Sequence, residues 1–349
     1  MEQRIIISEL FESDLAMAMS ECEHDGVFVI CDTNSYRCCW PEVSKYFTLR
    51  KAGEITVDAG DTHKDLEHLT FVWEKLQQGG ANRHSLIINL GGGMVTDLGG
   101  FAAATFKRGV NFINVPTTLL AMVDASVGGK TGVNFGGMKN ELGVFAQASR
   151  VIINTQWLRT LDAENLRSGY AEMLKHGLLA DEKMWAELVG FDLSQPDLRS
   201  LSALVGGSID VKARYVEQDP NERGIRKALN LGHTFGHALE EWSLRRRPLL
   251  HGYAVAYGLV CELYLSAVRL GFPTERMRQT VAFIRAYYGV PDLSCDDYEE
   301  LLFLMHHDKK TRHGEINATL LTAVGQPVID QTISDEEARE ALDFLREGA

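Results

Sequence analysis

Residues 85–93 read Ser-Leu-Ile-Ile-Asn-Leu-Gly-Gly-Gly, an apolar run that ends in three consecutive glycines. A continuous apolar run of this length is typical of a strand buried on both faces of a parallel sheet. The glycines predict a tight turn into a helix, where the backbone can approach a pyrophosphate at the helix N-terminus. A turn with a purely structural role fits three glycines equally well.

Three further runs resemble this strand, at residues 26–31, 110–115 and 150–154. Strands that alternate with helical segments predict a parallel sheet covered on both faces, an α/β nucleotide-binding arrangement. From about Leu161 helical periodicity takes over, with helices expected at 163–180, 198–218, 229–245, 253–270 and 274–288. We therefore predict an α/β domain at residues 1–160 and an all-α domain at residues 161–349, with catalysis in the cleft between them.

The composition narrows the classes of partner. Of the 349 residues, 45% are apolar and 24% charged, as in ordinary globular proteins. The net charge of -13 and the pI of about 5.3 argue against nucleic acid or an anionic membrane as partner. We expect no signal peptide and no apolar stretch long enough to span a bilayer. The six cysteines form no CxxC pair, so we expect reduced thiols and a cytoplasmic location.

Residues 128–131, Gly-Gly-Lys-Thr, resemble the end of a phosphate-binding P-loop. The full spacing of a P-loop requires a glycine where Asp124 stands, so that motif is not predicted. A glycine-rich turn with Lys130 remains, and Lys139 follows it closely. Two solvated lysines are the alternative, but lysines among glycine turns in an acidic protein favour the binding of phosphate or carboxylate.

The second half of the chain contains a candidate metal centre. His233 and His237 are four residues apart, His251 follows a proline-containing turn, and Glu172 stands three residues before Lys175. Imidazole with carboxylate suits Zn²⁺, and three protein ligands leave a position open for substrate. We expect Glu172, His233 and His251 as ligands and His237 as an orienting or proton-carrying group. For any single histidine, a structural role on an apolar helix is the alternative.

Basic and amide side chains accompany this candidate centre. Arg226 and Asn230 precede His233 by seven and three residues, so the three are expected on one helical stripe. Lys212 precedes them, and a Lys-Lys pair at residues 309–310 follows. Each charge alone is typical of a solvated surface, but together they predict an anion pocket beside the metal.

Together these motifs resemble the 3-dehydroquinate synthases of the sugar phosphate cyclase superfamily. The shared motifs run in the family's order from about Asp32 to Lys310: GGGMVTDLGGFAAATFKRGV, PTTLLAMVDASVGGKTGVN, GMKN, SGYAEMLKHG, RKALNLGHTFGHALE and LLHG. The resemblance implies a Rossmann-like N-terminal domain, an α-helical C-terminal domain and a homodimer. It also implies bound NAD⁺ and a divalent metal ion, usually Zn²⁺, with Co²⁺ as an alternative.

The resemblance assigns roles position by position. The metal ligands that it implies are Glu172, His233 and His251. The cofactor contacts that it implies are Asp32, Asn34, Asp61, Lys64, Gly92, Gly93, Asp97, Thr117, Thr118, Lys130, Lys139 and Thr160. The substrate and catalytic residues that it implies are Asp124, Lys130, Lys139, Asn140, Lys175, Lys212, Arg226, Asn230 and His237, with one of Lys309 and Lys310. Arg108 matches an arginine that reaches the phosphate site from the partner subunit.

The family converts 3-deoxy-D-arabino-heptulosonate 7-phosphate (DAHP) to 3-dehydroquinate and phosphate, on the route to aromatic amino acids. The resemblance implies that NAD⁺ takes a hydride from a secondary alcohol, phosphate leaves by β-elimination, and NADH returns the hydride. Ring opening and intramolecular aldol closure then form the carbocycle. The metal would lower the pKa of the reacting hydroxyl, lysines and Arg108 would stabilise the phosphate, and His237 would carry a proton.

Three positions depart from the family pattern. Thr96 precedes Asp97 where the family usually has glycine, Asp61 replaces a glutamate, and Tyr253 follows His-Gly where an acid is usual. None of these changes removes a predicted ligand. Tyr253 is the departure that would alter the surroundings of the metal.

Three alternative functions remain open at this point. The chain could be a cyclase for an aminated DAHP analogue or for sedoheptulose 7-phosphate, a metal-dependent polyol dehydrogenase of the glycerol dehydrogenase type, or a non-catalytic sugar-phosphate-binding protein. Cyclases for substrates without a carboxylate tend to lose part of the basic and His/Asn set. That set is retained here, which favours DAHP.

Overall fold

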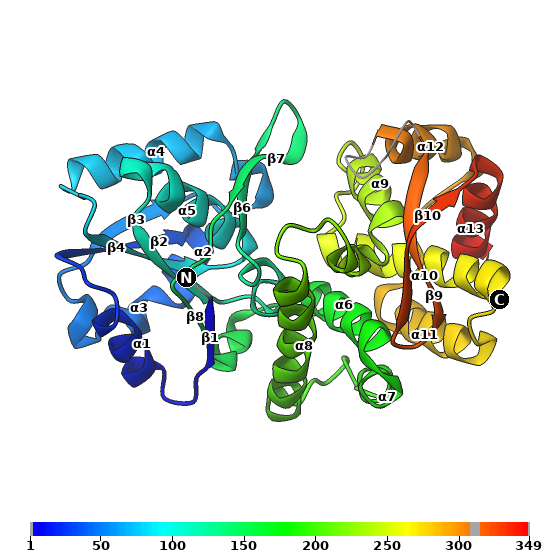
Figure 1. The fold of residues 1–349 in the computed structure, drawn as a ribbon, viewed down its shortest axis with the longest axis horizontal. Helices are drawn as coiled ribbons and strands as arrows, with labels where there is room; N and C mark the ends of the chain where they lie inside the picture. The colour runs from blue at the N-terminus through cyan, green and yellow to red at the C-terminus, as the bar shows by residue number, and fades with distance from the viewer. Residues whose placement is uncertain (1–2, 308–314, 348–349) are drawn as a thin grey trace. The chain divides into compact units, whose positions relative to one another are not determined.

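The computed structural model describes residues 3–307 and 315–347, and the chain divides into two compact units after Asp162. The N-terminal unit is an α/β structure and the C-terminal unit is mainly helical (Figure 1). The predicted succession of an α/β N-terminal part and a helical C-terminal part is therefore confirmed.

The N-terminal unit is built on a six-stranded parallel sheet with the strand order β1-β8-β5-β4-β2-β3. In Figure 1, α4 and α5 lie on one side of this sheet and α1 and α3 on the other. The elements of the unit are β1 (Arg4–Ile7), α1 (Phe11–Ser20), β2 (Gly26–Asp32), α2 (Thr33–Cys38), α3 (Trp40–Val43), η1 (Phe47–Leu49), β3 (Gly53–Val57), η2 (Asp61–His63), α4 (Leu66–Gln78), β4 (Ser85–Gly91), α5 (Gly93–Thr105), η3 (Phe106–Arg108), β5 (Asn111–Pro116), η4 (Ala121–Ala125), β6 (Lys130–Phe135), β7 (Met138–Phe145), β8 (Arg150–Ile153) and η5 (Thr155–Thr160).

The four apolar runs singled out in the sequence form β2, β4, β5 and β8. These four strands are adjacent in the sheet, and every residue of the central strand β4 is buried. Because helices cover both faces of the sheet and β5 and β2 cover the two edges of β4, β4 can be apolar without alternation. The edge strands β1 and β3 are more exposed; β3 alternates polar and apolar residues, whereas β1 is a short run of three isoleucines after Arg4.

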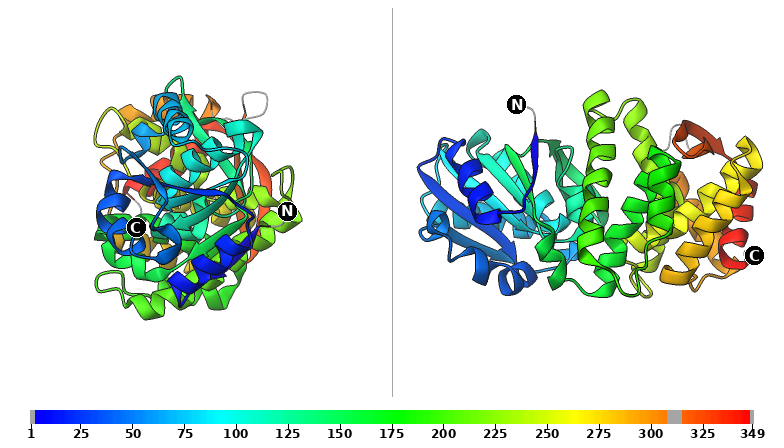
Figure 2. Two further views of the ribbon diagram at one scale, coloured as in Figure 1. Left: turned by 90° about the vertical axis from the view of Figure 1, so that its left-hand side faces the viewer. Right: turned by 90° about the horizontal axis from the view of Figure 1, so that it is seen from below.

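The C-terminal unit packs its helices around the long, buried α10, which contacts α6, α9, α11 and α13 and can be followed in yellow in Figure 2. Its elements are α6 (Ala163–Ala180), α7 (Glu182–Val189), α8 (Leu198–Gln218), η6 (Ile225–Asn230), α9 (His233–Ser243), α10 (His251–Leu270), α11 (Thr274–Tyr288), η7 (Cys295–Asp297), α12 (Tyr298–His307), β9 (Ile316–Ala323), β10 (Gln326–Ile333) and α13 (Asp335–Glu347).

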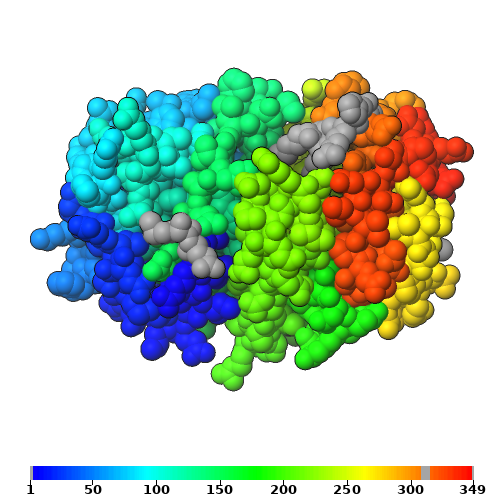
Figure 3. Space-filling model, in the orientation of Figure 1, coloured from blue at the N-terminus to red at the C-terminus, as the bar shows by residue number. Residues whose placement is uncertain are grey.

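The prediction of an all-α C-terminal domain needs one correction, because β9 and β10 form an antiparallel hairpin in this unit. The hairpin turns at Gly325, whose φ of +79° favours glycine. An ion pair of 2.7 Å between Lys227 and Asp330 ties the hairpin to η6. Figure 3 shows the orange-red hairpin beside the yellow-green segment that follows α8.

The helix expected over residues 229–245 is also corrected. A 3₁₀ turn, η6, ends at Asn230, and α9 begins only at His233. Gly232 between them has a left-handed φ of +82°, which interrupts the helix. The expectation that Arg226, Asn230 and His233 share one helical stripe is therefore wrong.

The expectation about membrane spans is wrong in one respect. Helix α10 is long and apolar enough to cross a bilayer, with a mean hydropathy of 1.3 over its most apolar window. However, 67% of that window is buried inside the protein. Its apolar surface is accounted for by the core of the C-terminal unit.

Candidate active site

Three side chains from three helices converge in the C-terminal unit. Glu172 lies on α6, His233 begins α9 and His251 begins α10. A Glu172 carboxylate oxygen lies 3.4 Å from Nε2 of His233 and 3.5 Å from Nε2 of His251. All three ligand atoms lie within 4.8 Å of one another. Bonds of about 2.0–2.1 Å to a tetrahedral ion would separate ligand atoms by about 3.3 Å, so these residues fit a divalent metal ion.

The second nitrogen of each histidine ring faces an oxygen. Nδ1 of His233 lies 3.1 Å from the carbonyl oxygen of Leu231, and Nδ1 of His251 lies 3.2 Å from the carboxylate of Glu240. An oxygen acceptor at Nδ1 holds the proton there and directs the Nε2 lone pair toward Glu172. This arrangement is typical of histidines that bind metals.

The local charge also favours a cation. Burial lowers the pKa of His251, but the carboxylates of Glu240 and Glu172 outweigh burial and raise that pKa to about 10. Without a metal, His251 therefore carries a proton at neutral pH. A metal ion at Nε2 would take the place of that proton, so metal binding releases a proton.

Two further predicted residues, Lys175 and His237, lie on α6 and α9, the same helices as Glu172 and His233. The ammonium of Lys175 forms an ion pair with Glu172, and both side chains are fully buried. The ring of His237 lies one helical turn after His233, with centroids 5.3 Å apart, and 6.2 Å from that of His251. His237 is thus beside the two candidate histidine ligands.

The candidate anion-binding residues are buried or half-buried in this unit. Lys212 is buried on α8. Arg226 is buried in η6 and donates a hydrogen bond of 2.7 Å to the carbonyl of Pro220. Asn230 donates one of 3.1 Å to the carboxylate of Glu222. Lys309 and Lys310 lie outside the described residues.

The carboxylate of Glu262 fixes the start of α9. It reaches across from α10 and accepts hydrogen bonds from the backbone N–H groups of Gly232, at 2.6 Å, and Thr234, at 3.1 Å. These are donors that the first turn of a helix leaves unpaired, and a carboxylate also complements the helix dipole there. Glu262 thereby positions the first turn of α9, which carries His233.

Glycines bring α9 and α10 close together. A Cβ at Gly258 would lie 1.9 Å from the carbonyl oxygen of Gly232 and 2.8 Å from the amide nitrogen of Gly236. A Cβ at Gly252 would lie 1.8 Å from the carbonyl oxygen of Ser168 on α6. The glycines beside the candidate ligands are therefore required by backbone packing.

In the N-terminal unit, five predicted cofactor residues lie at the carboxyl ends of adjacent parallel strands. Asp32 ends β2, Gly92 and Gly93 follow β4, and Thr117 and Thr118 follow β5. Gly92 is the N-cap of α5, and a Cβ there would lie 3.0 Å from the Thr118 side chain. This edge of a parallel sheet, with a helix N-terminus and room for close backbone approach, suits a dinucleotide.

A network of charges lies beside this edge. The buried ammonium of Lys64 is 3.0 Å from the carboxylate of Asp97 and 3.1 Å from that of Asp61. Lys139 lies 3.0 Å from the other oxygen of Asp61. Burial lowers the pKa of Lys64, but Asp97 and Asp61 outweigh it and raise that pKa. The structure thus brings together four of the predicted cofactor residues.

Backbone contacts connect the β6–β7 hairpin to the same network. The Asn134 side chain donates a hydrogen bond of 2.8 Å to the carbonyl of Asp61, and its backbone N–H donates one of 2.7 Å to that of Lys64. Its side-chain oxygen accepts a hydrogen bond of 2.9 Å from the N–H of Asn140, which has a left-handed φ of +51°. These contacts hold the hairpin against the η2 turn, so that Lys139 of β7 reaches Asp61.

The other predicted residues of this unit are more dispersed. Asp124 is half-buried in η4, and Lys130 begins β6 with an exposed side chain. Asn34 is exposed on α2, and the hydroxyl of Thr160 donates a hydrogen bond to the carbonyl of Trp157. Asp32 accepts a hydrogen bond of 2.7 Å from the N–H of Ser35 as the cap of α2, which accounts for part of its hydrogen-bonding capacity.

Arg108 lies in a strained turn. Lys107 and Arg108 both have left-handed backbone angles, with φ of +53° and +71°, directly before Gly109. Such angles cost about 1–3 kcal/mol each for residues other than glycine. Two consecutive residues with such angles define the backbone of the turn that carries Arg108 after α5.

Two buried carboxylates that act on the candidate centre, Glu240 and Glu262, were not predicted from the sequence. Glu240 lies seven residues after His233, which places both on one face of α9. That spacing was a usable signal for Glu240. Glu262 lies in α10 and shows no comparable spacing to α9, so only the packing of the helices reveals it.

Glu240→Gln is expected to lower the affinity for a divalent metal by about 10–100-fold, because an amide is a weaker acceptor for the Nδ1–H of His251. Competition with a chromophoric chelator measures this affinity directly. Glu241→Gln is the matched control, since Glu241 is the exposed neighbour on the same helix. Equal affinities of the two variants would contradict the orienting role of Glu240.

Two family models together match most of the chain: the 3-dehydroquinate synthase N-terminal model covers residues 54–168 and the C-terminal model residues 169–311. A 3-dehydroquinate synthase from Parabacteroides distasonis is 49% identical over 99% of this chain and 98% of its own length. Another, from Bordetella pertussis, is 40% identical over 85% of this chain and 83% of its own length.

A solved structure shares the fold. The 2-epi-5-epi-valiolone synthase from Streptomyces hygroscopicus, with NAD⁺ and Zn²⁺ bound, aligns with a TM-score of 0.87 at 24% identity, covering 99% of this chain and 97% of that one. At this identity the likeness shows the fold alone. The family models and the relatives in sequence carry the assignment further, and they place this chain in the 3-dehydroquinate synthase family.

Proposed function

We propose that the chain is a 3-dehydroquinate synthase, a carbon–oxygen lyase that converts DAHP to 3-dehydroquinate and phosphate in the biosynthesis of aromatic amino acids. The observation that carries this proposal is the convergence of Glu172, His233 and His251, in a chain that is 49% identical to a relative of that name over nearly its whole length. The substrate is a small phosphorylated sugar acid.

The two units have different tasks in this proposal. Residues 1–160 bind NAD⁺, supported by the strand ends and the N-terminus of α5. Residues 161–349 hold a divalent metal ion, which we propose to be Zn²⁺, with Glu172, His233 and His251 as ligands. When bound, NAD⁺ removes and returns one hydride and the metal ion polarises the reacting carbon–oxygen bond, so the cofactor is not consumed.

The side chains of the chain bind and orient the substrate. Lys212 and Arg226, both buried, offer positive charge for the carboxylate and phosphate of DAHP. Lys175 balances the charge of Glu172 in a fully buried ion pair. His237, beside the ligand histidines, is the group that moves a proton to or from the substrate. We assign Asp124, Lys130, Lys139, Asn140 and Asn230, with one of Lys309 and Lys310, to substrate contacts.

On the cofactor side, we propose contacts from the residues at the strand ends and from the charge network. The Lys64 ammonium, held by Asp61 and Asp97, provides a fixed positive charge for the dinucleotide phosphates. The full set is Asp32, Asn34, Asp61, Lys64, Gly92, Gly93, Asp97, Thr117, Thr118, Lys130, Lys139 and Thr160.

The deciding experiment measures phosphate release from DAHP with catalytic amounts of NAD⁺, with and without a chelator. A synthase releases one phosphate per DAHP with no net NADH, and the chelator stops turnover. A polyol dehydrogenase would instead accumulate NADH in proportion to product. Turnover of sedoheptulose 7-phosphate but not DAHP would assign the chain to another cyclase, and no turnover with any of these substrates would reject catalysis.

We also propose that the enzyme is a cytoplasmic homodimer in which Arg108 binds the substrate phosphate of the partner subunit. Four apolar side chains on the β6–β7 hairpin are exposed: Phe135, Met138, Val144 and Phe145. Burial of such a patch against a second copy would remove it from water. The free cysteines fit a reducing compartment.

Arg108→Ala is expected to raise the KM for DAHP by about tenfold or more, because a charge-assisted hydrogen bond to phosphate contributes about 1.5–3 kcal/mol. Lys107→Ala is the matched control, since Lys107 also has a left-handed φ. Steady-state phosphate release measures both variants. An unchanged KM and kcat for Arg108→Ala would count against the assignment.

A mixing experiment tests whether Arg108 acts across the dimer. If it does, mixing inactive Glu172→Gln chains with Arg108→Ala chains restores up to about a quarter of wild-type activity at DAHP concentrations well below the wild-type KM, because each mixed dimer regains one intact site. If Arg108 acts within its own chain, mixing restores nothing.

A further inference from the structure

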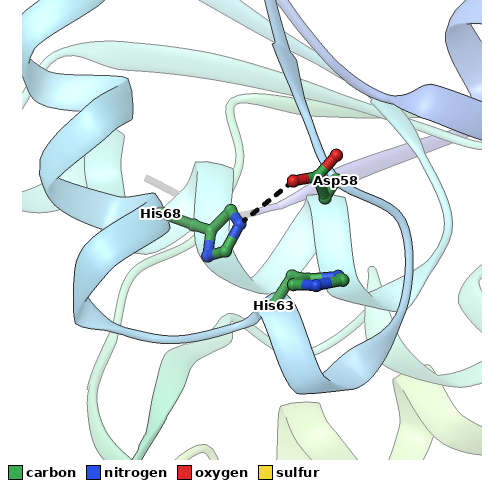
Figure 4. A group of neighbouring side chains, drawn as sticks. All are labelled: Asp58, His63 and His68. Atoms are coloured by element: carbon green, nitrogen blue, oxygen red, sulfur yellow. Dashed lines mark ion pairs between the residues drawn. The ribbon is translucent and has the colours of Figure 1, made fainter.

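We propose that Asp58, His63 and His68 form a second divalent metal site on the N-terminal unit, separate from the Glu172 site. Figure 4 shows the three side chains as neighbours, with an ion pair between His68 and Asp58. Their ligand atoms lie within 4.8 Å of one another. The proposed 3-dehydroquinate synthase activity does not use any of these residues.

The three residues come from consecutive elements of the fold. Asp58 follows β3, His63 ends the short η2 turn, and His68 lies in the first turn of α4. Nε2 of His68 lies 3.7 Å from a carboxylate oxygen of Asp58, and the two imidazole rings lie 4.9 Å apart. A tetrahedral ion with bonds of about 2.0–2.1 Å separates its ligands by about 3.3 Å, so small side-chain adjustments complete the site.

Both histidines have the hydrogen-bonding pattern that prepares a ring for a metal. Nδ1 of His63 lies 2.8 Å from the carbonyl oxygen of Ala59, and Nδ1 of His68 lies 2.9 Å from the carboxylate of Asp65. A carbonyl oxygen only accepts hydrogen bonds, so Nδ1 of a neutral His63 carries the proton and Nε2 keeps its lone pair. The Asp65–His68 pair repeats the carboxylate–histidine arrangement seen at Glu240 and His251.

The need to cap α4 does not explain this pattern. Asp65 caps the helix by accepting a hydrogen bond from the backbone N–H of His68 at 2.9 Å, which requires no particular side chain at that position. The imidazole contact with Asp65 is additional, and it directs Nε2 toward Asp58. His63 lies outside the helix and takes no part in the cap.

The donor set selects the class of cation. Two imidazole nitrogens and one carboxylate suit Zn²⁺, Co²⁺ or Ni²⁺, whereas Mg²⁺ and Ca²⁺ prefer oxygen ligands. Asp58 is exposed and both histidines are half-buried, so water can complete the coordination. A bound ion would link the end of β3, the η2 turn and the start of α4 to one another.

The test counts the Co²⁺ ions bound by the full-length chain, using equilibrium dialysis and elemental analysis. The variant is His63→Asn with His68→Asn, which removes both nitrogen ligands. The matched control is His84→Asn, an exposed histidine elsewhere on the same unit. The changed side chains lie outside the core, so we expect both variants to fold. Thermal unfolding of all three proteins checks this.

We expect the double variant to bind one Co²⁺ fewer per chain than the wild type and the His84→Asn control. The result is a difference in bound Co²⁺ between proteins, so an ion at the Glu172 site does not affect it. The result can therefore be interpreted even if the proposed function is wrong. Crystals soaked in Zn²⁺ should show an anomalous peak within about 2–2.3 Å of Nε2 of His68. Equal stoichiometry in all three proteins, or no peak at His68, overturns the proposal.

Discussion

Glu172→Gln is expected to lower phosphate release from DAHP by a factor on the order of 1,000 or more, with loss of the metal ion. The carboxylate is fully buried, and one of its oxygens lies 3.4 and 3.5 Å from the Nε2 atoms of two histidines. An amide keeps the shape but cannot supply the negative charge. Loss of a metal that contributes several kcal/mol to the transition state corresponds to this factor. His251→Ala should have the same effect.

The measurement pairs steady-state phosphate release with the metal content of the purified variant. Glu164→Gln is the matched control, because Glu164 lies on the same helix but is exposed in its first turn. Circular dichroism verifies that both variants are folded. Full turnover by metal-free Glu172→Gln would refute the metal centre.

Gly258→Ala is expected to destabilise the protein by about 3 kcal/mol or more. The added methyl group would meet the carbonyl oxygen of Gly232 at 1.9 Å, and backbone atoms cannot rotate out of the way as side chains can. Helices α9 and α10 would have to separate, which moves both His233 and His251. Denaturant unfolding measures the loss, and metal affinity should fall with it.

The control is Gly207→Ala on α8. A Cβ there finds only the methyl carbon of Met184, at 3.9 Å, and the position is exposed on a helix. Alanine is a better helix former than glycine by up to about 1 kcal/mol, so this variant should be neutral or stabilised. If Gly258→Ala unfolded at the same denaturant concentration as Gly207→Ala, the close packing would play no part in stability.

Local periodicity predicted much of the fold. The bounds of α6, α8 and α11 agree with the sequence pattern because their apolar faces repeat with the helical period. The break between η6 and α9 was not predicted, since apolar residues continue through residues 229–239 at helical spacing. Gly232 has a left-handed backbone conformation and lies close to α10. This is a tertiary contact, and no local sequence pattern contains it.

For the candidate site too, the sequence predicted some of the residues and missed others. Glu172, His233 and His251 were predicted because imidazole and carboxylate groups suit a metal, and the structure brings their ligand atoms together. The roles of the individual substrate and cofactor residues stay predictions. Glu240 and Glu262 were missed because a single glutamate on a helix is usually solvated. Their burial depends on how α9 and α10 cross.

The carboxylate of Glu262 holds the start of α9 from α10, and the two helices deliver one histidine each. The conformational entropy of bringing these histidines together is therefore lost when the polypeptide folds rather than when an ion arrives. Removal of the ion should leave the backbone geometry in place. Reconstitution would then proceed as an association without refolding.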